Sequence, residues 1–348
     1  MRLMRILTRV VEMSLVVIAL AASISAAAQA NWDVTKTMHI GGAGAWDYVT
    51  VDNDSHRLFI TRSTHTQIID DQTGNVLGDI PGQKRSHGVT LVPALNRGFI
   101  TDGGGDGAIV VFDLKTYAIL GTLATMPDSD GIIYDRLLDL VLAVSGDKGM
   151  LMIFKPDIDP AKGKIDPPID LGGSPEFLQY DDAGKAYVAM ADKDVIDVVD
   201  LKARKVIARW PVAPGGRPVG LSIDRKSHRL FIGCRNPQKL IVMSTVDGKV
   251  IADLPIGAGV DAVKNHAGLV FASAGDGTLT VIGEKAGKFE VEQTVKTPLG
   301  ARTMGIDEST FTVFLPTAEF LPAAPGAASR RPTPKPDSFM IVAVGQTR

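Results

Sequence analysis

The sequence has one cysteine among its 348 residues, so no disulfide can form within the chain. It contains no Cys-x-x-Cys-His motif for covalent haem attachment, no phosphate-binding loop ending in Lys-Ser/Thr, and no Gly-x-Ser-x-Gly turn. These absences exclude a c-type cytochrome and leave no recognised signature of phosphoryl transfer or of a serine hydrolase. Whether the chain is an enzyme is uncertain from its motifs.

Aromatic residues are scarce, at 6% of the chain, and the formal net charge is only −2. Single-stranded nucleic acid is bound by stacking on aromatic side chains, and phosphate backbones attract basic proteins. The composition therefore argues against nucleic acid as a partner. A small molecule or a periplasmic protein is the expected partner, and a monomer is the expected state.

The N-terminus carries signals of export. Three arginines lie within the first nine residues, an apolar stretch follows at 15–22, and Ala28-Gln29-Ala30 fits the small-x-small rule for cleavage. We expect residues 1–30 to be a signal peptide and residues 31–348 to be a single periplasmic or secreted domain without a membrane span. An uncut membrane anchor is the alternative, although the apolar stretch is short for a span.

An apolar, strand-like run with a large central residue returns seven times along the chain. The central residues are Phe59, Phe99, Leu142, Tyr187, Phe231, Phe271 and Phe314, spaced by about 40 to 45 residues. Short alternating runs between Asp, Asn and Gly clusters indicate strands and turns within each repeat. This period and these units predict an all-β fold, a seven-bladed β-propeller in which each repeat is one four-stranded blade.

The two ends of the chain complement each other. Residues 34–40 read as a fourth strand with no blade before it, and the last repeat stops after its third strand at 339–344. Pairing these strands would close the ring and cover both sheet edges. We therefore expect the N-terminal strand to complete the C-terminal blade.

A proline-rich segment, 316–336, is inserted in the last blade between its second and third strands. Its composition favours an extended or disordered loop. A surface insertion and a flap over the binding face are both compatible with it.

The first repeat opens on Tyr48-Val49-Thr50-Val51, and Asp-x-x-Thr and Asp-Gly turns recur. With the period near forty, these features resemble the YVTN-repeat family, and the exported single-domain form is similar to bacterial YncE-type seven-bladed β-propellers. Gly275-Asp276-Gly277-Thr278 and Leu315-Pro316-Thr317 are similar to one subgroup. The resemblance covers nearly the whole mature chain. It implies a periplasmic propeller, usually without assigned chemistry, some of whose relatives are reported to bind DNA.

Aligning the repeats places ionisable residues at one equivalent position, just before the first strand of each blade. We call these six residues the mouth ring: Asp47, His87, Asp130, Glu176, Asp261 and Arg302, with Val219 as the apolar exception. Innermost strands of a propeller start at the mouth of its central channel, so equivalent positions should meet there. The mouth ring is therefore the predicted ligand site.

Crowded carboxylates raise one another's pKa values or recruit a cation. The candidate metal ligands are His87, Asp130, Glu176 and Asp261. Oxygen ligands with one imidazole suit Ca²⁺, Mg²⁺, Mn²⁺ or Zn²⁺. The sequence establishes no cofactor, and a solvated polar channel without a metal is the alternative.

Three functions are compatible with these features. The first is an exported periplasmic binding protein that holds a ligand or partner on the face carrying the mouth ring. The second is a metal-dependent lactonase or related hydrolase, in which a cation polarises the carbonyl and His87 or a carboxylate deprotonates water. The third is a soluble partner of a periplasmic redox system. The catalytic residues of any enzyme activity are unknown at this point.

Overall fold

The computed structural model describes residues 31–322 and 332–347, so the predicted signal peptide lies outside the described residues. The described chain is all-β, with strands β1 to β27 and two short 3-10 helices, η1 (Asn53–Ser55) and η2 (Pro93–Leu95). Within these ranges no helix has the length and apolar character that a membrane span requires.

Residues 49–211 form three antiparallel sheets. The first sheet has seven strands: β2 (Val49–Asp52), β3 (Arg57–Thr61), β4 (Ser63–Asp70), β5 (Val76–Val92), β6 (Arg97–Asp102), β7 (Ala108–Asp113) and β8 (Ile119–Ala124). The second comprises β9 (Ser129–Asp135), β10 (Leu140–Ser145), β11 (Met150–Phe154) and β12 (Ile169–Asp170). The third comprises β13 (Pro175–Tyr180), β14 (Lys185–Met190), β15 (Val195–Asp200) and β16 (Lys205–Pro211).

Three further four-stranded sheets follow. One comprises β17 (Pro218–Asp224), β18 (Arg229–Arg235), β19 (Gln238–Ser244) and β20 (Val250–Pro255). The next comprises β21 (Val260–His266), β22 (Leu269–Ala274), β23 (Thr278–Lys285) and β24 (Lys288–Lys296). The last comprises β25 (Gly305–Asp307), β26 (Thr312–Thr317), β27 (Met340–Thr347) and, from the other end of the chain, β1 (Asn31–His39).

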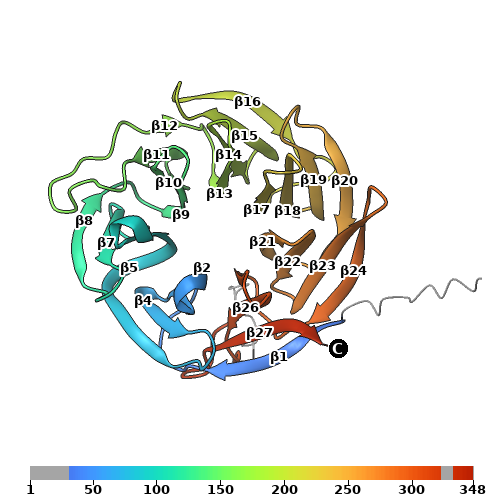
Figure 1. Ribbon diagram of the computed structural model, residues 1–348, viewed down its shortest axis with the longest axis horizontal. Coiled ribbons are helices and arrows are strands. Elements are labelled where there is room, and N and C mark those ends of the chain that lie inside the picture. The colour runs from blue at the N-terminus through green and yellow to red at the C-terminus, as the bar shows by residue number, and fades with distance from the viewer. Residues whose placement is uncertain (1–30, 323–331, 348) are drawn as a thin grey trace, which may run out of the picture. The chain divides into compact units, whose positions relative to one another are not determined.

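The sheets stand around a common centre (Figure 1). Strands β2, β9, β13, β17 and β21 lie nearest to it, and β8, β16, β20, β24 and β1 lie outermost. This is the arrangement of a β-propeller, as the repeats predict. The long strand β5 belongs to two neighbouring groups of strands, pairing with β4 in its first part and with β6 in its second.

Six of the seven repeated large residues lie in core clusters shared by two neighbouring sheets, and Phe59 packs between strands of the seven-stranded sheet. Each lies on β3, β6, β10, β14, β18, β22 or β26 and is at most 4% exposed. The ring centroid of Phe59 lies 5.8 Å from that of Phe112, and that of Phe99 lies 5.6 Å from that of Phe154 in the next sheet. The sequence period therefore follows from packing, because every repeat needs one large side chain to fill the space before the next.

The N-terminal strand pairs with the C-terminal one. The pairing of β1 with β27 is antiparallel and runs from Asn31 opposite Thr347 to His39 opposite Met340, so the strand begins three residues before the predicted start. Trp32 carries the packing of β1, because its ring centroid lies 4.9 Å from that of Phe271 and 5.0 Å from that of Phe311.

The proline-rich segment begins as a strand. β26 continues to Thr317, and Pro316 lies opposite Ile341 of β27. β25 ends its pairing opposite Phe314, so Pro316 has a strand on one side only, where a missing N–H is tolerated. The described ends of the segment also meet, because the Lys335 N–H donates to the Glu319 carbonyl at 2.7 Å.

Removing the indole of Trp32 should destabilise the protein strongly. Trp32 is 2% exposed, and we expect Trp32→Ala to lower the free energy of unfolding by about 3–5 kcal/mol, because a cavity opens where β1 packs against β22. Thr37→Ala, on an exposed position of the same strand, should change it by less than about 0.5 kcal/mol. Urea unfolding of the chain beginning at Asn31 measures both. Equal, small losses would show that β1 is not an integral part of the fold.

Candidate functional site

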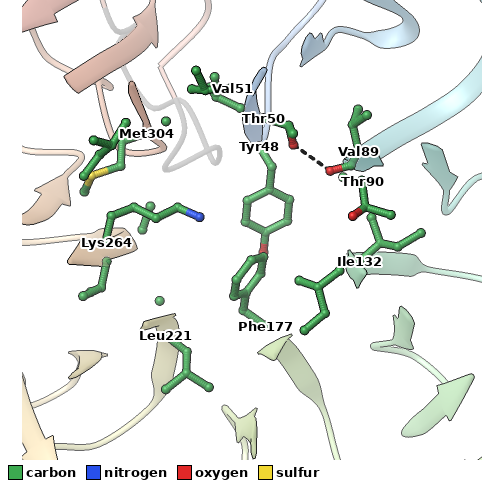
Figure 2. Close-up of a pocket in the computed structure, with 18 of the residues that line it drawn as sticks. Tyr48, Thr50, Val51, Val89, Thr90, Ile132, Phe177, Leu221, Lys264 and Met304 are labelled. Carbon is green, nitrogen blue, oxygen red and sulfur yellow. Dashed lines mark hydrogen bonds between the residues drawn. The ribbon is translucent and has the colours of Figure 1, made fainter. Parts of the chain in front are cut away.

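A cavity of about 270 Å³ lies at the centre of the sheets (Figure 2). It is lined by residues on or directly beside β2, β5, β9, β13, β17, β21 and β25. These are the strands that aligning the repeats identifies as the first of each repeat. Residues from Tyr48 to Glu308 thus converge on one space.

Three residues of the mouth ring lie in direct contact. The Nδ1 atom of His87 on β5 lies 2.6 Å from Oδ2 of Asp47 and 3.5 Å from Oδ1 of Asp130. His87 is 9% exposed, and both carboxylates are half-buried. One imidazole nitrogen is therefore placed between two carboxylates.

The burial and charges of this group shift its protonation. Burial by itself lowers the pKa of His87, but the hydrogen bond to Asp47 and the charge of Asp130 outweigh it and raise the pKa to about 8. Burial raises the pKa of Asp130 well above its usual range; the charge of His87 opposes this, and the carboxylates of Asp47 and Glu176 reinforce it. At neutral pH the His87 ring is therefore protonated, and its proton on Nδ1 lies between the two acids.

A second group joins two residues of the mouth ring, Asp261 and Arg302, to Arg235, which lies outside the ring's definition. Oδ1 of Asp261 accepts a hydrogen bond from Nη2 of Arg235, and Oδ2 accepts one from Nε of Arg302. Arg235, which ends β18, also donates through Nε to the Val260 carbonyl at 2.9 Å. Both oxygens of Asp261 are thereby paired with cations. Burial raises the pKa of Glu176, and the charge of Arg235 partly offsets this.

The backbone at this level brings the ring residues close together. Five inner strands, β5, β9, β13, β17 and β21, have register shifts here, and such bulges re-aim side chains. Glycines follow the ring position. A Cβ on Gly131 would lie 2.8 Å from the Glu176 carbonyl oxygen, and one on Gly220 would lie 2.9 Å from the Val263 nitrogen. Only glycine allows neighbouring inner strands to approach this closely.

Three cavity residues are missing from the predicted site. Tyr48, Phe177 and Lys264 point into the cavity from different strands (Figure 2). The ring centroids of Tyr48 and Phe177 are 5.1 Å apart at 45°, and Lys264 Nζ lies 5.6 Å from the Phe177 centroid. They stand one or three residues after the mouth-ring position, where most other repeats have small or aliphatic residues. Extending the alignment by three positions would have identified them.

The structure brings together only part of the predicted metal set. Potential ligand atoms of Asp47, His87 and Asp130 all lie within 4.8 Å of one another. Asp47 thus joins His87 and Asp130 in this group, whereas Asp261 is paired with arginines. The grouping defines a polar cluster and is not in itself evidence of a metal.

Comparison with known proteins identifies the fold. No family model matches the sequence, and no curated protein matches it. The WD40 beta propeller domain of Doa1 is similar in structure, with a TM-score of 0.69 and 14% identity over 91% of this chain and 98% of that one. A chain of the Mitotic Checkpoint Complex is also similar, with a TM-score of 0.71 and 10% identity over 89% of this chain and 93% of that one.

The fold is a β-propeller. At these identities the likeness concerns the fold alone. The resemblance to the YVTN-repeat family stays a prediction.

The stability contributed by His87 should depend on pH. Because its pKa rises from 6.5 to about 8 on folding, the charged ring stabilises the folded state fully below pH 6.5, and this contribution is lost as the pH rises through about 8. The shift corresponds to about 2 kcal/mol. We therefore expect His87→Gln to cost that much more at about pH 6 than at about pH 9 in urea unfolding.

NMR titration of the His87 ring provides an independent reading, with a pKa of about 8 that falls in Asp47→Asn. A cost of His87→Gln that is the same at both pH values would contradict the raised pKa.

Proposed function

We propose that this chain is an exported, periplasmic or secreted binding protein whose central cavity takes a small ligand, entering from the face that carries the mouth ring. The observation that supports this most directly is the cavity itself. Its walls are mainly apolar, and a few polar and charged groups, among them Thr50, Thr90 and Lys264, converge on it. Pre-formed apolar spaces with a few placed polar groups are typical of ligand sites.

The finer architecture belongs to the same proposal. We infer seven blades, with β5 ending one blade and starting the next, and a ring closed by β1 on the sheet of β25 to β27. The supporting observations are the seven inner strands that line one cavity and the pairing of β1 with β27. Membership of the YVTN-repeat, YncE-type group and export through residues 1–30 are likewise proposed from the sequence.

The mouth ring is suited to an entrance, because five of its six residues already have ion-pair partners among the described residues, with Glu176 as the exception. His87 is shared by Asp47 and Asp130, and Asp261 is shared by Arg235 and Arg302. Paired ions attract a charged ligand less than free ones do, so the mouth would orient a ligand by hydrogen bonds and admit it to the apolar space below.

A protein partner is the second occupant to consider for this face. One of the similar propellers is a chain of a multiprotein complex, the Mitotic Checkpoint Complex. A scaffold role, in which the loops at the mouth hold another protein, would use the same fold without the cavity.

A metal-dependent lactonase or other hydrolase is the alternative function. It is favoured by the proximity of ligand atoms on Asp47, His87 and Asp130, and by the burial of Asp130 Oδ1, which has no hydrogen-bond partner among the described residues. A metal must displace the proton from an imidazole that it binds. The raised pKa of His87, about 8, makes this step cost about tenfold in metal affinity at neutral pH. The binding function is preferred because of the cavity and its lining.

Filling the cavity should abolish ligand binding. Ile133 is half-buried and lines the cavity from β9, so Ile133→Trp places an indole in or beside the space. Ile251→Trp is the control, because Ile251 is exposed on the outer strand β20. Small carboxylates, alcohols, amines and peptides are screened by thermal shift and titrated calorimetrically. We expect Ile133→Trp to bind these ligands at least about tenfold more weakly than the wild type does. Ile251→Trp should bind them with the affinity of the wild type. Unchanged binding by Ile133→Trp would place the site elsewhere.

Metal analysis separates the two functions. We expect the purified mature chain to hold less than one equivalent of Ca²⁺, Mg²⁺, Mn²⁺ or Zn²⁺, and Asp130→Ala or Glu176→Ala to leave this content unchanged. One tightly held ion per chain that disappears in both variants would favour the hydrolase over the binding protein.

A further inference from the structure

Lys264 is a cation without an ion-pair partner inside the cavity. It extends from β21 toward the aromatic rings of Tyr48 and Phe177 (Figure 2). None of the ion pairs found within residues 31–322 and 332–347 includes it. Glu308 also lines the cavity but lies beyond ion-pair distance, and Asp261 already holds two arginines.

An ammonium in this position favours an anionic ligand. Burial lowers the pKa of Lys264, and the charge of Glu308 only partly offsets this. The cause is the removal of water from a charged group that no nearby anion compensates. A ligand oxygen that carries a negative charge would supply the partner, and charge-assisted hydrogen bonds are roughly twice as strong as neutral ones.

The rest of the cavity suits a flat apolar body. The inclined rings of Tyr48 and Phe177 meet in the middle of the space, with Lys264 and Met304 on one side of the pair and Ile132 on the other (Figure 2). Aromatic rings pack favourably against such a pair in offset or edge-on arrangements. The free volume of about 270 Å³ limits the ligand to a small molecule.

The number of cationic side chains that line the cavity indicates how much negative charge a ligand can carry. Phosphate groups carry nearly two charges and three acceptor oxygens, and they are usually held by several donors. Lys264 is the one cationic side chain that lines the cavity among the described residues. A carboxylate carries a single charge and matches it.

We propose that the cavity binds a small aromatic monocarboxylate, whose carboxylate accepts a hydrogen bond from Lys264 Nζ and whose ring packs against Tyr48 and Phe177. This assignment rests on the proposed binding function and names its ligand class.

The test compares ligands that differ only in charge. Benzoate, benzyl alcohol and inorganic phosphate are titrated calorimetrically into the mature chain and into Lys264→Met. We expect benzoate to bind the wild type and to bind Lys264→Met at least about tenfold more weakly. Benzyl alcohol has the ring without the charge and should bind both proteins equally. Phosphate should bind neither.

Matched variants exclude trivial explanations. Lys202→Met, at an exposed position, should bind benzoate like the wild type. Phe177→Leu should weaken benzoate and benzyl alcohol alike, because it removes the ring that both contact. Circular dichroism melting verifies that each variant is folded, and Lys264→Gln replaces Lys264→Met if the latter is not.

Two results would overturn the inference: equal benzoate affinity in the wild type and in the folded Lys264 variant, or no benzoate binding at millimolar concentration. If Ile133→Trp still abolishes the binding of other ligands in either case, the cavity remains the site and only the ligand class is wrong. If Ile133→Trp leaves all binding intact, the proposed function itself fails.

Discussion

The structure depends on how closely each inner strand approaches the next. Glycines at 88, 131 and 220 follow the mouth-ring position, and a Cβ on any of them would come within 3.0 Å of an atom on the neighbouring strand. This close approach keeps the central space small. It brings side chains that are some forty residues apart in sequence into hydrogen-bonding distance, as His87 and Asp47 show. With wider spacing, water would separate the same residues and screen their charges.

The charged residues of the mouth ring and the charged residue Lys264 of the cavity differ in how they are paired. In the mouth ring, His87 lies between the acids Asp47 and Asp130, and Asp261 lies between two guanidiniums. Lys264, three residues after Asp261 on β21, has aromatic and aliphatic neighbours but no ion pair among the described residues. A charge removed from water is costly unless it is paired. An anionic ligand would therefore stabilise Lys264 more than it would stabilise the paired charges of the mouth ring. In the proposed binding function, the mouth ring would serve entry and Lys264 with its aromatic neighbours would serve recognition.

The sequence predicts the propeller well because its repeats have a packing cause. Phe99 and Phe271 recur because each packs against a ring of a neighbouring sheet, and such a requirement returns with every repeat. The contacts of His87 with Asp47 and Asp130, and of Arg302 with Asp261, join equivalent positions of successive repeats, which the alignment of the repeats places together. The pairing of Arg235 with Asp261 could not be predicted, because Arg235 reaches Asp261 from the end of another strand and the bulges that aim these side chains leave no clear sequence pattern.

The interior residues escaped prediction because they depart from the repeat. Tyr48, Phe177 and Lys264 occupy positions at which most other repeats have small or aliphatic residues. An alignment of the repeats reveals the positions that all blades share. It does not single out a residue that occurs at its position in one repeat only. In a repeat protein, the side chains that give a site its specificity are found among such residues.

The most direct test of the central cavity as the binding site is a crystal of the chain beginning at Asn31, soaked with para-iodobenzoate and measured for the anomalous scattering of iodine. The account predicts an iodine peak inside the ring of inner strands, beside Tyr48 and Phe177, with the carboxylate density at Lys264. Iodine peaks confined to the outer strands, with the cavity unchanged, would contradict it.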